Sequence, residues 1–138
     1  MDGKKVILFL LTFQSYIAIH SFGQKICYPW SYTANRVKDW HDLQEMGEIM
    51  SNEIQKSSRL YYSVGPGART EYQAIGGSGD WARGEMGIKW VFFLELPPTR
   101  RSKNAGFLLP ANHIQPTAES IFRGIREMGV QISHKIVP

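Results

Sequence analysis

The feature that most constrains the fold is the segment IKWVFFLEL at residues 88–96, which is almost entirely apolar and is followed directly by Pro97 and Pro98. A short apolar run that is stopped in this way is typical of a buried β-strand. A second apolar run, YIAIHS at residues 16–21, is also predicted to be a buried strand. Each run carries one ionisable residue near its carboxyl end, Glu95 in the first and His20 in the second.

Two amphipathic helices are predicted from apolar residues that recur every three or four positions. The first spans about residues 37–55, and its apolar face consists of Trp40, Leu43, Met46, Met50 and Ile54. The second begins near Pro116, and its buried stripe consists of Ile121, Phe122, Ile125 and Met128. Residues 27–36 are predicted to form a loop, and so are residues 63–87, which are rich in glycine and serine.

This order of strand, helix, loop, strand, loop and helix indicates an α/β fold whose sheet is covered on both faces. Ligands of such sheets bind beyond the carboxyl ends of the strands, which is where His20 and Glu95 are expected. The 138 residues are enough for a single domain with one modest core.

Composition argues against several classes of partner. The net charge is +4, but the basic residues are scattered, so a nucleic-acid surface is not expected. No stretch of 18 apolar residues occurs, so no membrane-spanning helix is expected. The single cysteine, Cys27, rules out an internal disulfide and is predicted to be a buried thiol. The sequence gives no indication of the oligomeric state.

Residues 1–15 have two interpretations. Two lysines followed by VILFLLTF are typical of the start of a secretory signal. However, no small-residue cleavage site follows, and a cut beyond the apolar run would fall close to His20. We therefore expect residues 16–21 to form a strand of the domain.

Glu95 and His20 are the residues best placed for chemistry. Desolvation at the end of an apolar strand raises the pKa of a carboxylate, as a general base requires, while the alternative for Glu95 is an ion pair with Arg100 or Arg101. His20 is a candidate zinc ligand or base, and its alternative is a histidine that bonds to the backbone.

Four motifs occur together in a recognisable order: YIAIHSFGQKICYPWSYT, EYQAIGGSGDWA, GIKWVFFLEL and GFLLPANHIQPTAESI. With them, the chain resembles, from about residue 16 to about residue 128, the C-terminal part of zinc metallocarboxypeptidases of the pancreatic carboxypeptidase A and B type. The resemblance implies an α/β fold, specifically the C-terminal part of a carboxypeptidase-like mixed sheet flanked by helices. It also implies a secreted protein that acts on the C-termini of peptides or proteins.

The catalytic roles that the resemblance implies fall on three residues. His20 matches the third ligand of a single zinc ion, and Glu95 matches the glutamate that takes a proton from the zinc-bound water. Tyr72 matches the mobile tyrosine that closes over the substrate and bonds its terminal carboxylate.

The resemblance also implies residues for substrate binding. Gly79 matches the floor of the specificity pocket, Phe107 would line that pocket, and Ser21 and Phe22 would border the neighbouring subsite. With glycine at the floor, the pocket is expected to be neutral and roomy and to favour apolar or aromatic side chains. Asp80, next to Gly79, is expected to be structural.

Departures from the family pattern limit these expectations. The family's other two zinc ligands and its substrate-binding arginines lie upstream of the position matched by Met1, and Pro97 and Pro98 replace an Arg-Asp pair. We therefore expect residues 1–138 to be one incomplete carboxypeptidase domain that is inactive alone. The alternatives are a non-catalytic binding protein on the same scaffold, or an unrelated small secreted binding domain.

Overall fold

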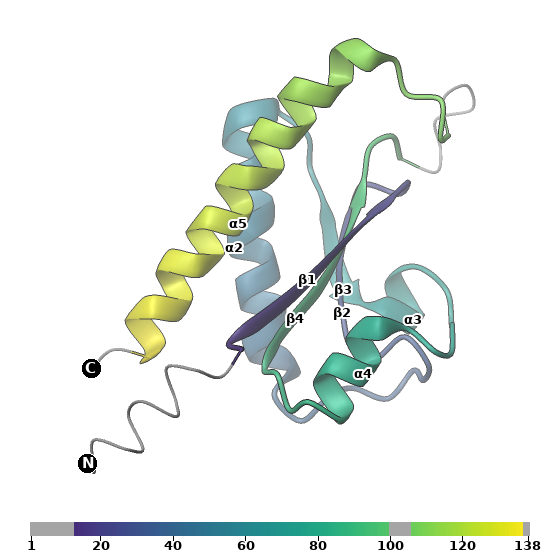
Figure 1. Ribbon diagram of the computed structural model, residues 1–138, viewed down its shortest axis with the longest axis vertical. Coiled ribbons are helices and arrows are strands. Elements are labelled where there is room, and N and C mark those ends of the chain that lie inside the picture. The colour runs from purple at the N-terminus through teal and green to yellow at the C-terminus, as the bar shows by residue number, and fades with distance from the viewer. Residues whose placement is uncertain (1–12, 100–105, 137–138) are drawn as a thin grey trace.

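The computed structural model describes residues 13–99 and 106–136, which include a four-stranded mixed sheet with strand order β1-β4-β2-β3 (Figure 1). β4 runs parallel to β1 and antiparallel to β2, and β2 runs parallel to β3. The predicted α/β class and mixed sheet are confirmed. The strands are β1 (Ser15–Ser21), β2 (Lys25–Tyr28), β3 (Ser63–Pro66) and β4 (Trp90–Leu96).

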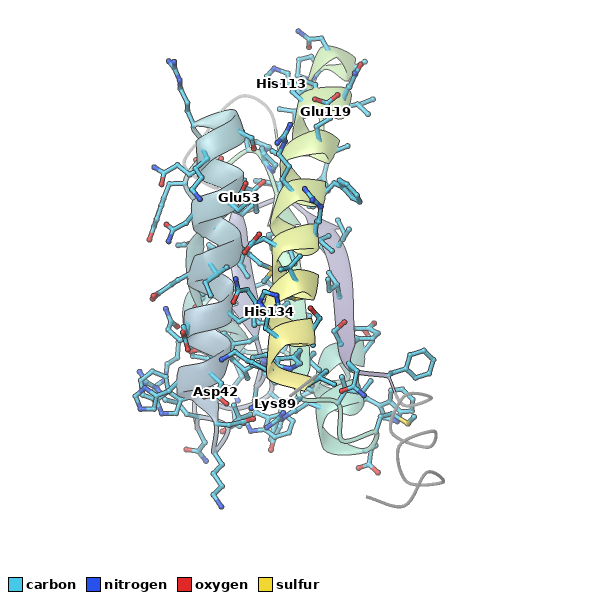
Figure 2. The ribbon with its side chains drawn as sticks, turned by 90° about the vertical axis from the view of Figure 1, so that its left-hand side faces the viewer. Asp42, Glu53, Lys89, His113, Glu119 and His134 are labelled. Carbon is cyan, nitrogen blue, oxygen red and sulfur yellow. The ribbon has the colours of Figure 1, made fainter. Side chains whose placement is uncertain are left out.

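Helices cover both faces of this sheet. The long helices α2 (Trp40–Ser58) and α5 (Ile114–Ile136) lie side by side on one face, and the short helices α3 (Gly67–Thr70) and α4 (Ser78–Gly84) lie on the other (Figure 1). A single turn of 3-10 helix, Ala111–His113, precedes α5. Figure 2 shows the packed pair of long helices, with Asp42 of α2 beside Lys89, whose amine lies 2.5 Å from the carboxylate.

β4 contributes to both layers because its side chains alternate between the two faces of the sheet. Phe92 and Leu94 are fully buried in the main core beneath α2 and α5. Val91 and Phe93 point the other way and pack with Ala82 of α4 in a second, smaller cluster. Glu95 continues this second register, so it lies on the α4 face of the sheet.

The predicted apolar stripe of α2 is confirmed, because Leu43, Met46, Met50 and Ile54 are buried and Trp40 is partly buried against the same core. The stripe predicted for α5 is wrong at Phe122, which is 65% exposed, although Ile121 and Met128 are buried. The buried line of α5 includes Gly124, which lies close to α2, since a β-carbon there would be only 2.8 Å from Ile54 Cγ1. Phe122 lies off that line by more than a quarter-turn of helix and faces outward.

Two loop predictions are wrong. Residues 63–87 contain β3, α3 and α4, and the first two residues of the segment 27–36 belong to β2. Glycine and proline lower the intrinsic helix and strand propensity of such segments. Here tertiary contacts override propensity, since β3 pairs with β2 and α4 packs on β1 and β4.

β1 is an edge strand of the described sheet, whereas the sequence predicted a buried strand. Among the described residues it pairs with β4 alone, and its last three residues are exposed. Ile19 shows the difference most clearly, with 53% of its surface accessible. This exposure places His20 at an open corner of the sheet.

Candidate active-site pocket at the ends of β1 and β4

The structure brings the two candidate catalytic residues together. In the parallel β1–β4 pairing, His20 lies directly opposite Glu95. Paired residues of neighbouring strands project from the same face of a sheet, and parallel strands end at the same edge. The imidazole and the carboxylate therefore project from the same face at the carboxyl edge of the sheet.

A cavity of about 220 Å³ opens beside this pair on the α4 face. Side chains from three strands and from the α3–α4 segment form its walls. Those that matter for chemistry are His20, Cys27, Glu71, Tyr72, Phe93 and Glu95. The pocket thus combines an apolar ring, a histidine, a phenol and two carboxylates.

The α3–α4 segment is held over the sheet by hydrogen bonds to residues 31 and 32. The carboxylate of Asp80 accepts the backbone N–H of Ser31 at 3.0 Å and that of Tyr32 at 2.9 Å. The N–H of Ala74 donates to the carbonyl of Ser31 at 2.9 Å, and the Gln73 amide donates to that of Tyr32 at 2.7 Å. Asp80 therefore has the structural role that the sequence analysis expected.

Tyr72 lies on the wall of this pocket and is 61% exposed. It lies in the connection between α3 and α4, directly before Gln73 and Ala74, which are hydrogen-bonded to residues 31 and 32. A phenol in this position can donate a hydrogen bond to a ligand that enters the pocket from solvent.

Gly79 is not the open floor that the sequence analysis expected. It is buried, and a β-carbon built on it would lie 2.1 Å from Cε1 and 2.3 Å from Cζ of Phe93. The Phe93 ring therefore fills the space that glycine leaves, and it is Phe93, not Gly79, that lines the cavity.

Sequence reasoning missed a second carboxylate, Glu71, in the pocket wall. Its side chain is only 10% exposed, and Lys25 Nζ lies 3.2 Å from Glu71 Oε2 while also donating to the carbonyl of Thr70 at 2.6 Å. Its position directly before Tyr72, at the start of the motif EYQAIGGSGDWA, was the signal that could have identified it.

Cys27 is confirmed as a buried thiol. Burial raises its pKa to about 12, and the nearby charge of Glu71 adds to this effect while Lys25 opposes it. Since the thiolate is the nucleophilic form, Cys27 does not act as a nucleophile near neutral pH.

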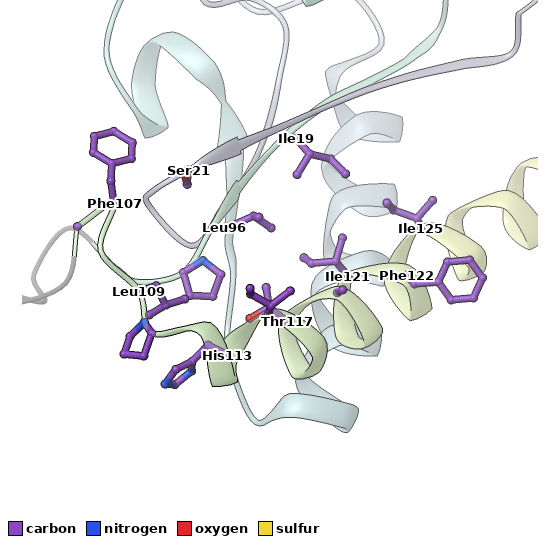
Figure 3. Close-up of a pocket in the computed structure, with 15 residues that line it drawn as sticks. Ile19, Ser21, Leu96, Phe107, Leu109, His113, Thr117, Ile121, Phe122 and Ile125 are labelled. Atoms are coloured by element: carbon purple, nitrogen blue, oxygen red, sulfur yellow. The ribbon is translucent and has the colours of Figure 1, made fainter.

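Phe107, Ser21 and Phe22 do not belong to this pocket. Ser21 and Phe107 line a separate apolar groove of about 480 Å³ between the sheet and α5 (Figure 3). Phe107 is 77% exposed and packs edge-on against Phe22, with ring centroids 5.0 Å apart. The reason is the strand alternation, which turns Ser21 to the face opposite that of His20. Phe107 therefore lines a different cavity from the one beside His20 and Glu95.

Within residues 13–99 and 106–136, no group of three histidine, cysteine, aspartate or glutamate side chains is arranged to hold a metal ion. A catalytic zinc site takes three protein ligands. The described residues therefore do not form a zinc site by themselves, although His20 can supply one nitrogen donor. The alternative partners for Glu95, Arg100 and Arg101, lie outside the described residues.

The sequence profile of the family described as zinc carboxypeptidase matches residues 4–124. The chain belongs to this zinc carboxypeptidase family. The match begins upstream of residue 16, where the recognisable motifs start.

Two relatives illustrate the extent of the similarity of this carboxypeptidase chain. Carboxypeptidase B of Astacus astacus is 35% identical over 122 residues, which cover 88% of this chain and 39% of the relative. Carboxypeptidase B of Homo sapiens is 37% identical over 117 residues, which cover 85% of this chain and 27% of the relative. The chain thus spans well under half the length of the relatives it matches.

Solved structures agree with the family assignment. Bovine thrombin-activatable fibrinolysis inhibitor, in complex with tick carboxypeptidase inhibitor, superposes with a TM-score of 0.83 and 29% identity over 96% of this chain and 44% of its own. Carboxypeptidase A from Helicoverpa armigera superposes with a TM-score of 0.79 and 25% identity over 96% of this chain and 34% of its own. In the described part of this carboxypeptidase chain, no helix is long and apolar enough to cross a membrane.

Proposed function

We propose that this chain serves in carboxypeptidase-type proteolysis, the hydrolysis of the peptide bond before the C-terminal residue of a peptide or protein. The observation that carries the proposal is the direct pairing of His20 and Glu95 at the mouth of a small pocket. The family's zinc dependence extends to this chain with His20 as the donor it contributes. We also propose an extracellular location, by resemblance to the family.

Glu95 would act as the general base. A base must reach the proton it removes, and the partly buried Glu95 lines the pocket near the carboxyl end of β4, where an attacking water could enter. Its carboxylate would take a proton from that water and later deliver one to the leaving amine. Tyr72 would donate a hydrogen bond to the substrate from the pocket wall.

The chain alone is expected to have little or no peptidase activity. It offers His20 and no group of three metal ligands among the described residues. An exopeptidase must also bind the negative C-terminal carboxylate, and no lysine or arginine lines the described pocket. Of the described residues that line the pocket, Tyr72 could contribute to this binding through its hydroxyl.

The same observations favour one alternative, a non-catalytic protein that binds peptide C-termini in this pocket. The two functions differ in what Glu95 does. In an enzyme its carboxylate is needed for turnover, whereas in a binding protein its replacement by an amide of similar shape leaves affinity nearly unchanged.

The test is peptide binding to the purified chain with and without zinc, followed by NMR amide shifts, together with a parallel assay for released C-terminal residues. A free C-terminus is expected to shift the amides of Tyr72, Phe93 and Glu95, and an amidated peptide is not. His20→Gln is expected to abolish the zinc-dependent part of the shifts, whereas His134→Gln, on the exposed end of α5 (Figure 2), serves as the matched control.

The outcomes separate the possibilities. Absence of any shift at the pocket refutes the proposal. Zinc-dependent release of C-terminal residues that Glu95→Gln abolishes and Glu119→Gln retains would show that the chain is an enzyme by itself. Binding that ignores both zinc and Glu95→Gln would support the binding protein.

A further inference from the structure

The two edges of the described sheet differ in how well they are protected from pairing with another chain. β3, at one edge, is four residues long and ends at Pro66, and both features limit pairing. β1, at the other edge, is seven residues long and contains no proline, lysine, arginine, aspartate or glutamate. An edge strand of this kind presents a row of backbone N–H and C=O groups with which a further strand can pair.

An apolar groove extends from the edge at β1 to α5. Ile19 projects into it from β1, across from Ile121 and Ile125 of α5 (Figure 3). Ile19 is 53% exposed, and Phe122, which also lines the groove, is 65% exposed. No lysine, arginine, aspartate or glutamate is among the described residues that line it. An apolar surface that continues an unprotected strand edge indicates an interface with another polypeptide.

The order of residues in β1 fits one partner in particular, which is a second copy of the same strand. In the sequence SYIAIHS, residues at equal distances from Ala18 on its two sides are of the same kind. An antiparallel pair centred on Ala18 would set these like residues opposite one another in the two copies: Ser15 and Ser21, Ile17 and Ile19, and the rings of Tyr16 and His20. A two-fold axis would make each of these contacts twice, as a symmetric dimer requires.

This register would also cover the groove. Ile17 and Ile19 pair with Phe92 and Leu94 of β4, which are buried on the side of α2 and α5. Opposite residues of an antiparallel pair share a face, with β-carbons about 5 Å apart. Ile17 of one copy would therefore lie against the exposed Ile19 of the other, at the open side of the groove. A slip of one residue would lose the match between the two isoleucines.

From these observations we infer that this chain forms a symmetric dimer in which the two β1 strands pair antiparallel and the two four-stranded sheets become one continuous sheet. The partner that covers the groove is a second copy of this chain. Both β1 edges are used in a single pair, so the assembly closes at two copies. The inference goes beyond the proposed function and does not depend on it, although it places Tyr16 of one copy beside His20 of the other.

The first test is sedimentation velocity of the purified chain over about a hundredfold range of concentration. The mass is expected to rise from that of one chain to that of two. Ile19→Lys is expected to weaken the dimer at least about tenfold, because it places a charge opposite Ile17 in an apolar contact. Ile75→Lys is the matched control and should leave the dimer unchanged, since Ile75 is 87% exposed and lines a different cavity. Circular dichroism of each variant confirms that it is folded.

The second test reads the register by cross-linking a chain that carries both Ser15→Cys and Ser21→Cys. Within one chain these positions stand at opposite ends of β1, about 20 Å apart, which is too far for a disulfide. Between copies they would lie opposite each other, so oxidised glutathione is expected to give a covalent dimer with the double variant and none with either single variant. The native Cys27 does not compete, because it is buried and its pKa is raised to about 12.

A chain that stays monomeric over the whole range would show that a different polypeptide covers the β1 edge, and would overturn the inference. A dimer that Ile19→Lys leaves intact, or a series of assemblies larger than two copies, would also overturn it. Cross-linking by Ser15→Cys alone would reveal another register or a parallel pair, and would equally contradict the proposed dimer.

Discussion

Replacing Gly79 with alanine tests whether Phe93 really occupies the space over this glycine. The added β-carbon would lie 2.1 Å from Cε1 and 2.3 Å from Cζ of the ring, well inside van der Waals contact. Overpacking of this severity costs about 3 kcal/mol, at the upper end of the usual range. Alanine regains about 1 kcal/mol of helix propensity over glycine within α4. We therefore expect the free energy of unfolding to fall by about 2 kcal/mol.

Urea denaturation followed by circular dichroism measures this change. With a slope of about 2 kcal/mol per molar urea, the midpoint should move down by about 1 M. Gly84→Ala is the control in the same helix, because its β-carbon would meet Trp30 at an ordinary 3.7 Å. Its unfolding free energy should stay level or rise by up to about 1 kcal/mol.

The decisive comparison repeats Gly79→Ala in a Phe93→Ala background. Without the ring the clash disappears, so the second substitution should have no cost or should stabilise by about 1 kcal/mol. An equal loss of stability in both backgrounds would show that the ring is not what constrains Gly79, and the argument that Phe93 closes this side of the pocket would fail.

Two further substitutions and one labelling experiment have expected results, some at residues near the pocket and one at a residue away from it. Asp80→Ala removes the acceptor of the Ser31 and Tyr32 amides, so both should exchange hydrogen at least tenfold faster by NMR, and unchanged exchange would contradict the structural role of this acid. Cys27, with a pKa of about 12, stays protonated at pH 8, so iodoacetamide should label it only as the chain unfolds in urea; rapid labelling of the native protein would show that the thiol is accessible. Gly129→Ala should raise the unfolding free energy by about 1 kcal/mol in thermal denaturation, because a β-carbon there meets no atom within 4 Å; a loss of stability would indicate a contact at this face of α5.

The parts of the fold that the sequence predicted are those with strong periodicity. α2 and β4 were predicted correctly because each buries a regular apolar pattern, with period near 3.6 in one and a continuous run in the other. β3 and α4 were missed because they are short and glycine-rich and depend on partners distant in the sequence. The contacts of β3 with β2, and of α4 with β1 and β4, produce no periodic pattern in the sequence of β3 or α4 themselves.

The site was predicted in part for similar reasons. The pairing of His20 with Glu95 could be expected from two strands that each end on an ionisable residue. The pocket wall could not be predicted in this way. Phe93 and Glu71 line the same cavity only because of the order of the strands and the path of the α3–α4 segment. The sequence could not show that Phe107 lines the groove beside α5, because motif resemblance does not reveal on which face of the sheet a residue lies.

Because β4 lies between β1 and β2, the sheet cannot be completed during translation until β4 has been made. β2, α2 and β3 are contiguous in the chain and can associate as soon as residue 66 has emerged from the ribosome. β1 is made first, yet its partner β4 follows roughly 4–15 s later at ordinary elongation rates. During that interval the edge of β1 that later pairs with β4 is unpaired, which is the state in which a strand is prone to aggregation. The His20–Glu95 pair is consequently absent from every nascent chain that has not yet reached residue 95, so the pocket beside this pair cannot form before β4 has been made.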